Sequence, residues 1–345
     1  MNTYTLKVVE VRKETEDTVT ICFKQPGLKK IKYLAGQYLT LMFRINGRRY
    51  LRPYSFSSAP GVDPFLEVTI KRVPNGVVSN YINNAVAIGD AIEVLQPIGD
   101  FVFPIERKAN QVFLWGVGSG VTPLFSLLKF ILNEESLNET QVHLIYGNHN
   151  IESSIFWNAL HILQQEHSDR LKITHFHTRS DKNENTNTSI FGRIQPDVVL
   201  KDYDLNQVNE SLHYICGPLD LKNNIKNVLS NYNLPSENLF IEDFELIKDP
   251  KDFETILTQQ VEINFQGKNS SVEVLKGKSI LEAALDAGIE LPYSCQTGNC
   301  NTCKGKLKSG ELRMIGLVKE REDLENNDYL LCCSHPLTED VYIQI

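Results

Sequence analysis

The chain has 345 residues, of which 41% are hydrophobic and 23% are charged, and its formal net charge is −8. These values are typical of a globular protein of two to three domains and argue against a nucleic-acid partner. No apolar run approaches the ~20 residues needed to span a bilayer, and the N-terminus does not resemble a signal peptide. We therefore expect a cytoplasmic protein without a membrane span.

The first predicted domain, residues 1–104, has the pattern of an antiparallel β-barrel. Short segments alternate apolar and polar residues, as expected of strands with one buried face. They cover residues 5–14, 17–25, 37–45, 65–73 and 90–99. Asn46-Gly47 follows the third segment and is typical of a two-residue hairpin turn. Cys22, within the second segment, is expected in the core.

The second predicted domain, residues 105–248, has the pattern of an α/β fold with a parallel sheet. Strand-like apolar segments alternate with segments of helical periodicity. The expected strands cover residues 111–118, 141–147, 171–177, 212–217 and 238–244, and the main expected helices cover residues 122–135 and 153–165. His175 and His177 share one face of their strand, which we expect to be a polar, outward face.

Residues 249–258 are predicted to be a linker, and residues 259–345 a third domain. Residues 261–278 predict a hairpin. Residues 279–289 predict a helix with Ser279 as its N-cap, Glu282 three residues later and Gly288 at its end. From residue 251 onward, 15 acidic residues stand against 10 basic ones. This acidic surface either only aids solubility or attracts a basic partner.

Three of the seven cysteines fall within nine residues, in a C-x4-C-x2-C pattern. Cys295, Cys300 and Cys303 form this pattern, and Cys332 follows further along the chain. This is the plant-type [2Fe–2S] spacing. Gly298 and small polar neighbours would let backbone N–H groups point at the sulfurs. The alternatives are a structural zinc site, which usually pairs two C-x2-C units or adds histidines, and unrelated free thiols. The spacing favours the iron–sulfur cluster.

The segments PYSCQTGNCNTCKGKL and YLLCCSHP resemble plant-type ferredoxins and the ferredoxin modules that are fused to oxidoreductases. This resemblance implies a β-grasp α+β fold. It also implies a last ligand four residues before a proline, so that Pro336 indicates Cys332, and Cys333 is a packed neighbour.

A cluster takes one electron at a time, whereas a nicotinamide delivers two as a hydride, so a flavin site is expected upstream. By itself, RPYSFSSAP at residues 52–60 could be a turn with a packed tyrosine, but it resembles the Arg-x-Tyr-Ser motif of the ferredoxin–NADP reductase superfamily. KRVPNGVVSNYI resembles the second flavin segment of that family, in which a helix start binds a pyrophosphate and so implies FAD rather than FMN. The implied FAD-binding residues are Arg52 on the pyrophosphate, Pro53, Tyr54 against the isoalloxazine, Ser55 on its N5 edge, Thr69, Lys71, Gly76, Val77, Val78 and Ser79.

WGVGSGVTPLFSLL, at residues 115–128, resembles the GxGxGxxP nicotinamide segment of the same family. Alone, such a glycine-rich turn between strand and helix is common. HTRS, at residues 177–180, follows the third strand, where the family binds the 2′-phosphate, and this favours NADPH while leaving NADH possible. The implied nicotinamide-binding residues are Gly116, Gly118, Ser119, Gly120, Thr122, Asn148, Thr178, Arg179, Arg193, Cys216, Gly217 and Pro218. Tyr54, Ser55 and Cys216 are the implied catalytic residues.

The order of the modules is similar to that of oxygenase reductase components, particularly the phenylacetyl-CoA epoxidase type. This resemblance implies electron transfer from NAD(P)H to FAD, then to the [2Fe–2S] cluster, then to a partner oxygenase. The alternatives are a reductase of a separate ferredoxin, flavodoxin or desaturase, and a redox-responsive interaction protein without turnover.

Overall fold

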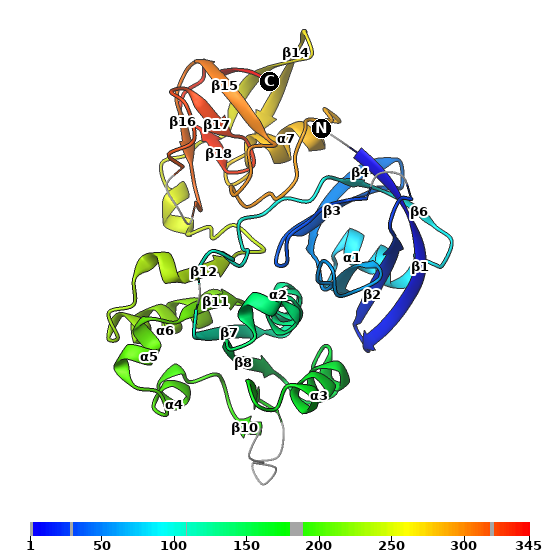
Figure 1. The fold of residues 1–345 in the computed structure, drawn as a ribbon. Coiled ribbons are helices and arrows are strands. Elements are labelled where there is room, and N and C mark those ends of the chain that lie inside the picture. Colours follow the sequence, from blue (N-terminus) through cyan, green and yellow to red (C-terminus); the bar gives the residue numbers. More distant parts are fainter. Residues whose placement is uncertain (1–2, 28–29, 108, 180–188, 318–320) are drawn as a thin grey trace. The chain divides into compact units, whose positions relative to one another are not determined.

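The computed structural model describes residues 1–345 except residues 1–2, 28–29, 108, 180–188 and 318–320 (Figure 1). The chain forms two compact units. The first comprises residues 1–43 and 54–242, and the second comprises residues 44–53 and 243–345.

The N-terminal part of the chain forms a six-stranded antiparallel sheet with the strand order β4-β3-β6-β1-β2-β5. Its strands are β1 (Thr3–Thr15), β2 (Thr18–Lys24), β3 (Tyr38–Ile45), β4 (Arg48–Ser55), β5 (Leu66–Lys71) and β6 (Ala91–Leu95), and helix α1 (Val77–Ala85) lies between β5 and β6 in the sequence. Leu66, Val68 and Ile70 alternate along β5 with Glu67 and Thr69, but all five are buried, so both faces of this strand are covered and not only the predicted one. Asn46 and Gly47 both have positive φ at the β3–β4 turn, as their sequence predicted.

A parallel sheet with the strand order β10-β9-β8-β7-β11-β12 follows (Figure 1). Its strands are β7 (Gln111–Val117), β8 (Gln141–Asn148), β9 (Leu171–His177), β10 (Ser189–Phe191), β11 (Leu212–Cys216) and β12 (Leu239–Glu242). Its main helices are α2 (Val121–Asn133), α3 (Trp157–Glu166), α4 (Pro196–Leu200), α5 (Leu205–Asn209) and α6 (Leu219–Ser230).

Side chains of β7 enter two separate cores. Val112 and Leu114 pack with α2 and α3, while Phe113 and Trp115 pack with α4, α5 and α6. Helices therefore cover both faces of the sheet, which confirms the predicted doubly wound α/β fold.

One prediction for this sheet was wrong. His175 and His177 are each only 1% exposed, not outward-facing. The ring of Trp157, on α3, lies 4.4 Å from that of His175, centroid to centroid. Because helices cover both faces of a parallel sheet, a polar residue in such a strand can be buried on either face. Helix α3 also begins later than predicted, at Trp157, because Phe156 before it has a left-handed φ of 62°.

The C-terminal part of the chain has the predicted β-grasp α+β fold. A mixed sheet with the order β14-β13-β19-β15-β17 carries helix α7 (Ile280–Asp286), and β16 pairs with β18. The strands are β13 (Gln259–Phe265), β14 (Lys268–Val274), β15 (Lys304–Ser309), β16 (Leu312–Met314), β17 (Asp328–Leu330), β18 (Ser334–Pro336) and β19 (Tyr342–Gln344). The predicted capping box of Ser279 and Glu282 is present at the start of α7.

The segment predicted to be a linker contains two buried apolar side chains. Phe253 and Ile256 pack against Ile315 in a small core of the second unit. At least this part of the segment is therefore fixed to the ferredoxin fold.

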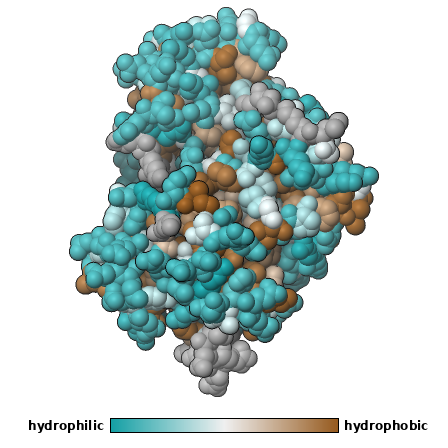
Figure 2. Space-filling view, viewed as in Figure 1, coloured by the Kyte–Doolittle hydropathy of each residue, from teal (hydrophilic) through white to brown (hydrophobic). Residues whose placement is uncertain are grey.

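The face shown in Figure 2 is mainly hydrophilic, with hydrophobic residues in small areas. Of the helices in the described part of the chain, none is long and apolar enough to cross a membrane.

Candidate flavin, nicotinamide and iron–sulfur sites

The Arg-x-Tyr-Ser motif ends strand β4. Ser55 is buried, and Tyr54 is only partly exposed. Beyond them, Thr69 on β5 donates a hydrogen bond to the buried hydroxyl of Ser57 at 2.9 Å and lies 2.8 Å from Thr20 Oγ1. The hydroxyls of Thr69, Ser57 and Thr20 thus form a buried hydrogen-bonded group next to the motif.

The second predicted flavin segment forms the start of α1. Gly76 precedes the helix, and no side chain caps its first N–H groups. Ser79 Oγ accepts a hydrogen bond from Val73 N at 3.1 Å, which closes the preceding turn. A β-carbon at Gly76 would lie 2.7 Å from that same oxygen. The turn therefore requires glycine and leaves helix N–H groups without a side-chain partner, which suits an anionic pyrophosphate.

The glycine-rich nicotinamide segment joins β7 to α2. Gly118–Gly120 form a 3-10 turn, and the start of α2 has no side-chain cap. A β-carbon at Gly120 would overlap the carbonyl oxygen of Cys216, at the end of β11. Glycine at residue 120 therefore lets two strand ends meet, and Cys216 is buried at this junction.

Apart from Arg52 and Pro53, the flavin and nicotinamide segments lie together in the first unit. Strand β5, which carries Thr69 and Lys71, packs against the Gly118–Gly120 turn. Burial, helped by the charges of Arg179 and Lys71, lowers the pKa of His149, so these three side chains share one electrostatic environment. The topology thus brings together residues that the sequence predicted separately.

Side chains also join the two parts of the first unit. Ser126 on α2 accepts a hydrogen bond from Gly36 N at 3.3 Å and donates one to Ser58 O at 2.6 Å. Lys129 forms an ion pair of 2.6 Å with Asp63, and its side chain is only 8% exposed. These contacts fix helix α2, which follows the nicotinamide segment, against loops of the N-terminal part of the chain.

Two buried polar atoms of the predicted nicotinamide site have no hydrogen-bond partner. They are Thr122 Oγ1, at the start of α2, and Asn148 Nδ2, at the end of β8. Within the described part of the chain, only seven buried side-chain polar atoms lack a partner, so two of them in one predicted site is notable. A dinucleotide could supply both partners, and the residues present therefore fit such a cofactor.

The predicted 2′-phosphate residues lie at the surface. Thr178 and Arg179 are exposed after β9, and Thr178 Oγ1 lies 3.2 Å from His149 Nδ1. Arg193 is 85% exposed and lies 3.8 Å from Asp220, a pair too exposed to fix it strongly. Gly217 and Pro218 connect Cys216 to α6, and Pro218 is the residue before its first turn.

The cysteine loop gathers the four predicted ligands. Cys300 Sγ lies 3.1 Å from Cys295 Sγ. Hydrogen bonds from Cys300 and then Cys332 lower the pKa of Cys295, and one from Cys332 lowers that of Cys303. Thr297 N also donates to Cys295 Sγ at 3.4 Å. The same hydrogen bonds raise the pKa of the two donors, Cys300 and Cys332. Four thiols joined by hydrogen bonds in this way suit the four-cysteine ligand set of a [2Fe–2S] cluster.

Left-handed backbone conformations shape this loop. Gln296 has a φ of 59° and Gly298 a φ of 74°. Arg321, from a distant segment, donates hydrogen bonds to Gly298 O and to Asn301 Oδ1, and Asp323 holds it at 2.7 Å. This brace holds the loop in its wrapped form and places a positive charge near the cysteines.

Cys333 has a different environment from Cys332. Its sulfur is fully buried and donates to Leu330 O at 3.3 Å. Cys332, by contrast, is hydrogen-bonded to Cys295 and Cys303.

Three family descriptions match the chain. "Oxidoreductase FAD-binding domain" covers residues 5–103, "Oxidoreductase NAD-binding domain" residues 114–227, and "2Fe-2S iron-sulfur cluster binding domain" residues 263–337. The ferredoxin reductase component of 3-ketosteroid-9-alpha-monooxygenase from Mycobacterium tuberculosis is 30% identical over 98% of this chain and 94% of its own length. A 1,2-phenylacetyl-CoA epoxidase subunit from Escherichia coli is 29% identical over 99% of this chain and 97% of its own length.

A solved structure has a similar fold. Phthalate dioxygenase reductase superposes with a TM-score of 0.69 over 100% of this chain and 98% of its own, at 23% identity.

The fold and the three sites define an FAD- and iron–sulfur-dependent NAD(P)H oxidoreductase. The chain belongs to the ferredoxin–NADP reductase superfamily, among the members with a C-terminal plant-type [2Fe–2S] domain. Its cofactors are FAD, a [2Fe–2S] cluster and a nicotinamide dinucleotide. FAD, when bound, accepts a hydride and releases its electrons singly to the cluster.

Several residues at these sites could not be found from the sequence. His149, Ser126 and Arg321 were not predicted as site residues, and each reaches its site through tertiary contacts. The only signal for His149 in the sequence was its position next to Asn148, a predicted nicotinamide-binding residue.

Proposed function

We propose that this chain is the reductase component of a multicomponent oxygenase and passes electrons from NADPH, through FAD and the [2Fe–2S] cluster, to a partner oxygenase. One observation supports this most strongly: relatives that match it over nearly its whole length are reductase parts of oxygenase systems. They serve a 3-ketosteroid monooxygenase, a phenylacetyl-CoA epoxidase and a glycine betaine monooxygenase. Because the oxygenases named in these relatives act on very different substrates, the partner oxygenase determines the substrate. A phenylacetyl-CoA epoxidase-like oxygenase is one candidate partner.

The residue roles in this proposal follow the motifs. Arg52 and the start of α1 hold the pyrophosphate, with Pro53, Thr69 and Lys71 beside the flavin. Tyr54 and Ser55 contact the isoalloxazine, and Cys216 faces the nicotinamide. The unpaired atoms of Thr122 and Asn148 support a dinucleotide between β7 and β8. The cluster ligands are Cys295, Cys300, Cys303 and Cys332.

Three further points belong to the proposal. The domains extend over residues 1–104, 105–248 and 259–345, joined by a linker at 249–258 whose Phe253 and Ile256 pack on the third domain. The donor is NADPH, because Arg179 and Arg193 provide positive charge after β9 and β10. The location is the cytoplasm, because cysteines with metal-cluster spacing rather than a disulfide framework are typical of a reducing compartment.

The test is an anaerobic visible titration of the purified protein with NADPH and, separately, NADH. We expect flavin bands and a cluster shoulder that bleach with about three electrons per chain, two for FAD and one for the cluster. NADPH should act at lower concentration, and Arg179→Gln should remove that preference. A flavin-only spectrum that bleaches with two electrons would contradict the proposal.

The acceptor is tested in the same preparation. With an artificial acceptor, NADPH oxidation should continue for many turnovers. A redox-responsive interaction protein would instead be reduced once and stop. Transfer to a purified oxygenase component should then exceed transfer to a separate ferredoxin or flavodoxin, and the opposite order would favour a general ferredoxin or flavodoxin reductase.

A further inference from the structure

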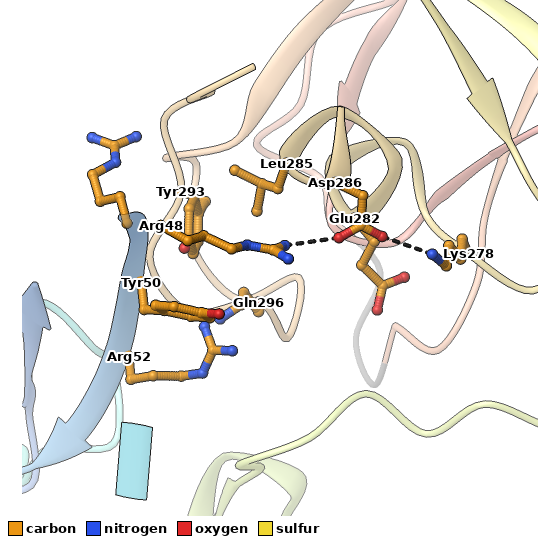
Figure 3. A pocket seen from close by; sticks show the side chains of 10 residues that line it. Arg48, Tyr50, Arg52, Lys278, Glu282, Leu285, Asp286, Tyr293 and Gln296 are labelled. Atoms are coloured by element: carbon orange, nitrogen blue, oxygen red, sulfur yellow. Dashed lines mark hydrogen bonds and ion pairs between the residues drawn. The ribbon is translucent and has the colours of Figure 1, made fainter. Parts of the chain in front are cut away.

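Within the second unit, residues 44–53 lie against the ferredoxin fold and line a pocket of about 240 Å³ with it (Figure 3). One wall consists of residues 48–50 and Arg52 on β4. The other consists of α7 and the cluster loop, including Asp286, Tyr293 and Gln296. The side chain of Tyr50 lies between those of Arg48 and Arg52, whose guanidinium carbons are 5.5 and 5.8 Å from its ring centroid.

Ion pairs connect the two walls. Arg48 Nη2 lies 2.8 Å from Asp286 Oδ1, a contact drawn as a dashed line in Figure 3. Arg44 and Arg49 each lie 3.4 Å from a different carboxylate oxygen of Glu290. Arg49 also donates hydrogen bonds to the carbonyls of Glu290 and Leu291, at 3.1 and 3.3 Å. Basic residues of one segment thus meet acidic residues of the other.

Backbone contacts lie beside these ion pairs. Leu51 N donates to Tyr293 Oη at 3.0 Å, and Gln296 Nε2 donates to Leu51 O at 3.4 Å. Tyr293 and Gln296 stand on either side of Cys295 in the sequence. Leu51 O also accepts a hydrogen bond from Arg52 Nη1 at 2.8 Å. One carbonyl therefore joins the first residue of the flavin motif to the neighbour of a cluster ligand.

We infer that Arg48 and Arg49 are positioning residues for electron transfer from the flavin to the cluster: they hold the Cys295 side of the cluster loop on Leu51, next to the Arg-x-Tyr-Ser motif. A single electron moves in this step, so the flavin is oxidised and the cluster reduced, and no bond to these side chains forms or breaks. The contact is reversible, because ion pairs this exposed are weak and screened by salt.

The test compares the full-length holoprotein with the double variant Arg48→Gln/Arg49→Gln in anaerobic stopped flow. Hydride transfer from NADPH, followed by flavin absorbance, should be unchanged. Reduction of the cluster should slow about fivefold at low salt, and the variant should lose the salt dependence of this step. The matched control is Lys308→Gln/Arg313→Gln, which removes two exposed positive charges elsewhere in the second unit.

Two further measurements separate positioning from a general loss of structure. Hydrogen exchange at the Leu51 amide should be faster in the Gln variant alone. Arg48→Lys/Arg49→Lys should restore much of the salt dependence, because it keeps both charges. The inference is overturned if cluster reduction keeps its rate and salt dependence in the Gln variant, or if Leu51 exchange is unchanged. None of these readouts needs a protein acceptor, so they stand apart from the oxygenase proposal.

Discussion

Gly120 lies so close to Cys216 that a β-carbon at residue 120 would overlap the Cys216 carbonyl oxygen. The backbone of Gly120 is otherwise ordinary, with a φ of −62° and a ψ of −15°. Glycine is therefore needed at residue 120 because a β-carbon would not fit, and not because the backbone adopts a conformation that only glycine can reach. The contact joins the turn before α2 to the end of β11, the two segments in which the nicotinamide site was predicted.

The variant Gly120→Ala tests this contact. Because backbone atoms cannot move aside as a side chain can, we expect a loss of about 1–3 kcal/mol in the free energy of unfolding and a higher KM for NADPH. Urea unfolding and steady-state kinetics measure the two effects. The control is Gly27→Ala, where a β-carbon would meet nothing within 4 Å. Equal behaviour of the two variants would refute the close approach.

Adjacent cysteines provide a matched test of the cluster ligands. We expect Cys332→Ser to lose the cluster, because Cys332 contacts Cys295 and Cys303. Cys333→Ser should retain it, because that thiol bonds to Leu330 O. Iron content and the low-temperature EPR signal of the reduced protein distinguish them. Loss of the cluster in Cys333→Ser but not in Cys332→Ser would reassign the fourth ligand.

Arg321 should tune the cluster as well as hold its loop. Removing its positive charge in Arg321→Gln disfavours the reduced, more negative cluster, so the midpoint potential should fall. A change of about 1 kcal/mol corresponds to roughly 40 mV for one electron. Potentiometric titration with EPR detection gives the shift. Arg321→Lys should shift the midpoint potential less, because it keeps the positive charge. Equal shifts in both variants would mean that the hydrogen bonds of Arg321, and not its charge, set the potential.

Buried histidines predict how the stability of the nicotinamide-binding fold depends on pH. Burial lowers the pKa of His143, His175 and His213 to about 3 in each case. Trp115 Nε1 donates to His213 Nδ1 at 3.1 Å, which requires that nitrogen to be unprotonated. Between pH 6.5 and 3 these histidines bind more protons in the unfolded chain than in the folded chain. Their contribution to the free energy of unfolding is therefore fully present above pH 6.5 and is lost as the pH falls through this window.

Each histidine should contribute a slope of about 1.4 kcal/mol per pH unit within that window. Urea unfolding at pH 7.5, 6 and 5, followed by tryptophan fluorescence, measures it. His213→Gln should reduce the slope by one proton. A stability that does not change across this range would show that the three rings are protonated in the folded state.

Features that depend on neighbouring residues in the chain could be predicted from the sequence. The capping box of Ser279 and Glu282 and the Asn46-Gly47 turn are set by local hydrogen bonds and backbone preferences. Alternating and helical patterns of apolar residues predicted the folds of the first two domains, because burial of one face is a strong and periodic requirement. The cysteine spacing predicted the cluster, because the reach of the ligands fixes that spacing, and the resemblance to ferredoxins implied the β-grasp fold around it.

Other features needed the folded chain. Whether His175 faces water depended on α3 covering its strand, and the late start of α3 depended on the left-handed Phe156. The sequence by itself determined the modules, their order and the chemistry of their cofactors. Only the tertiary structure decided which distant side chains support them, as Arg321 supports the cluster loop and Ser126 the flavin segment, because such contacts join residues whose separation along the chain carries no periodic signal.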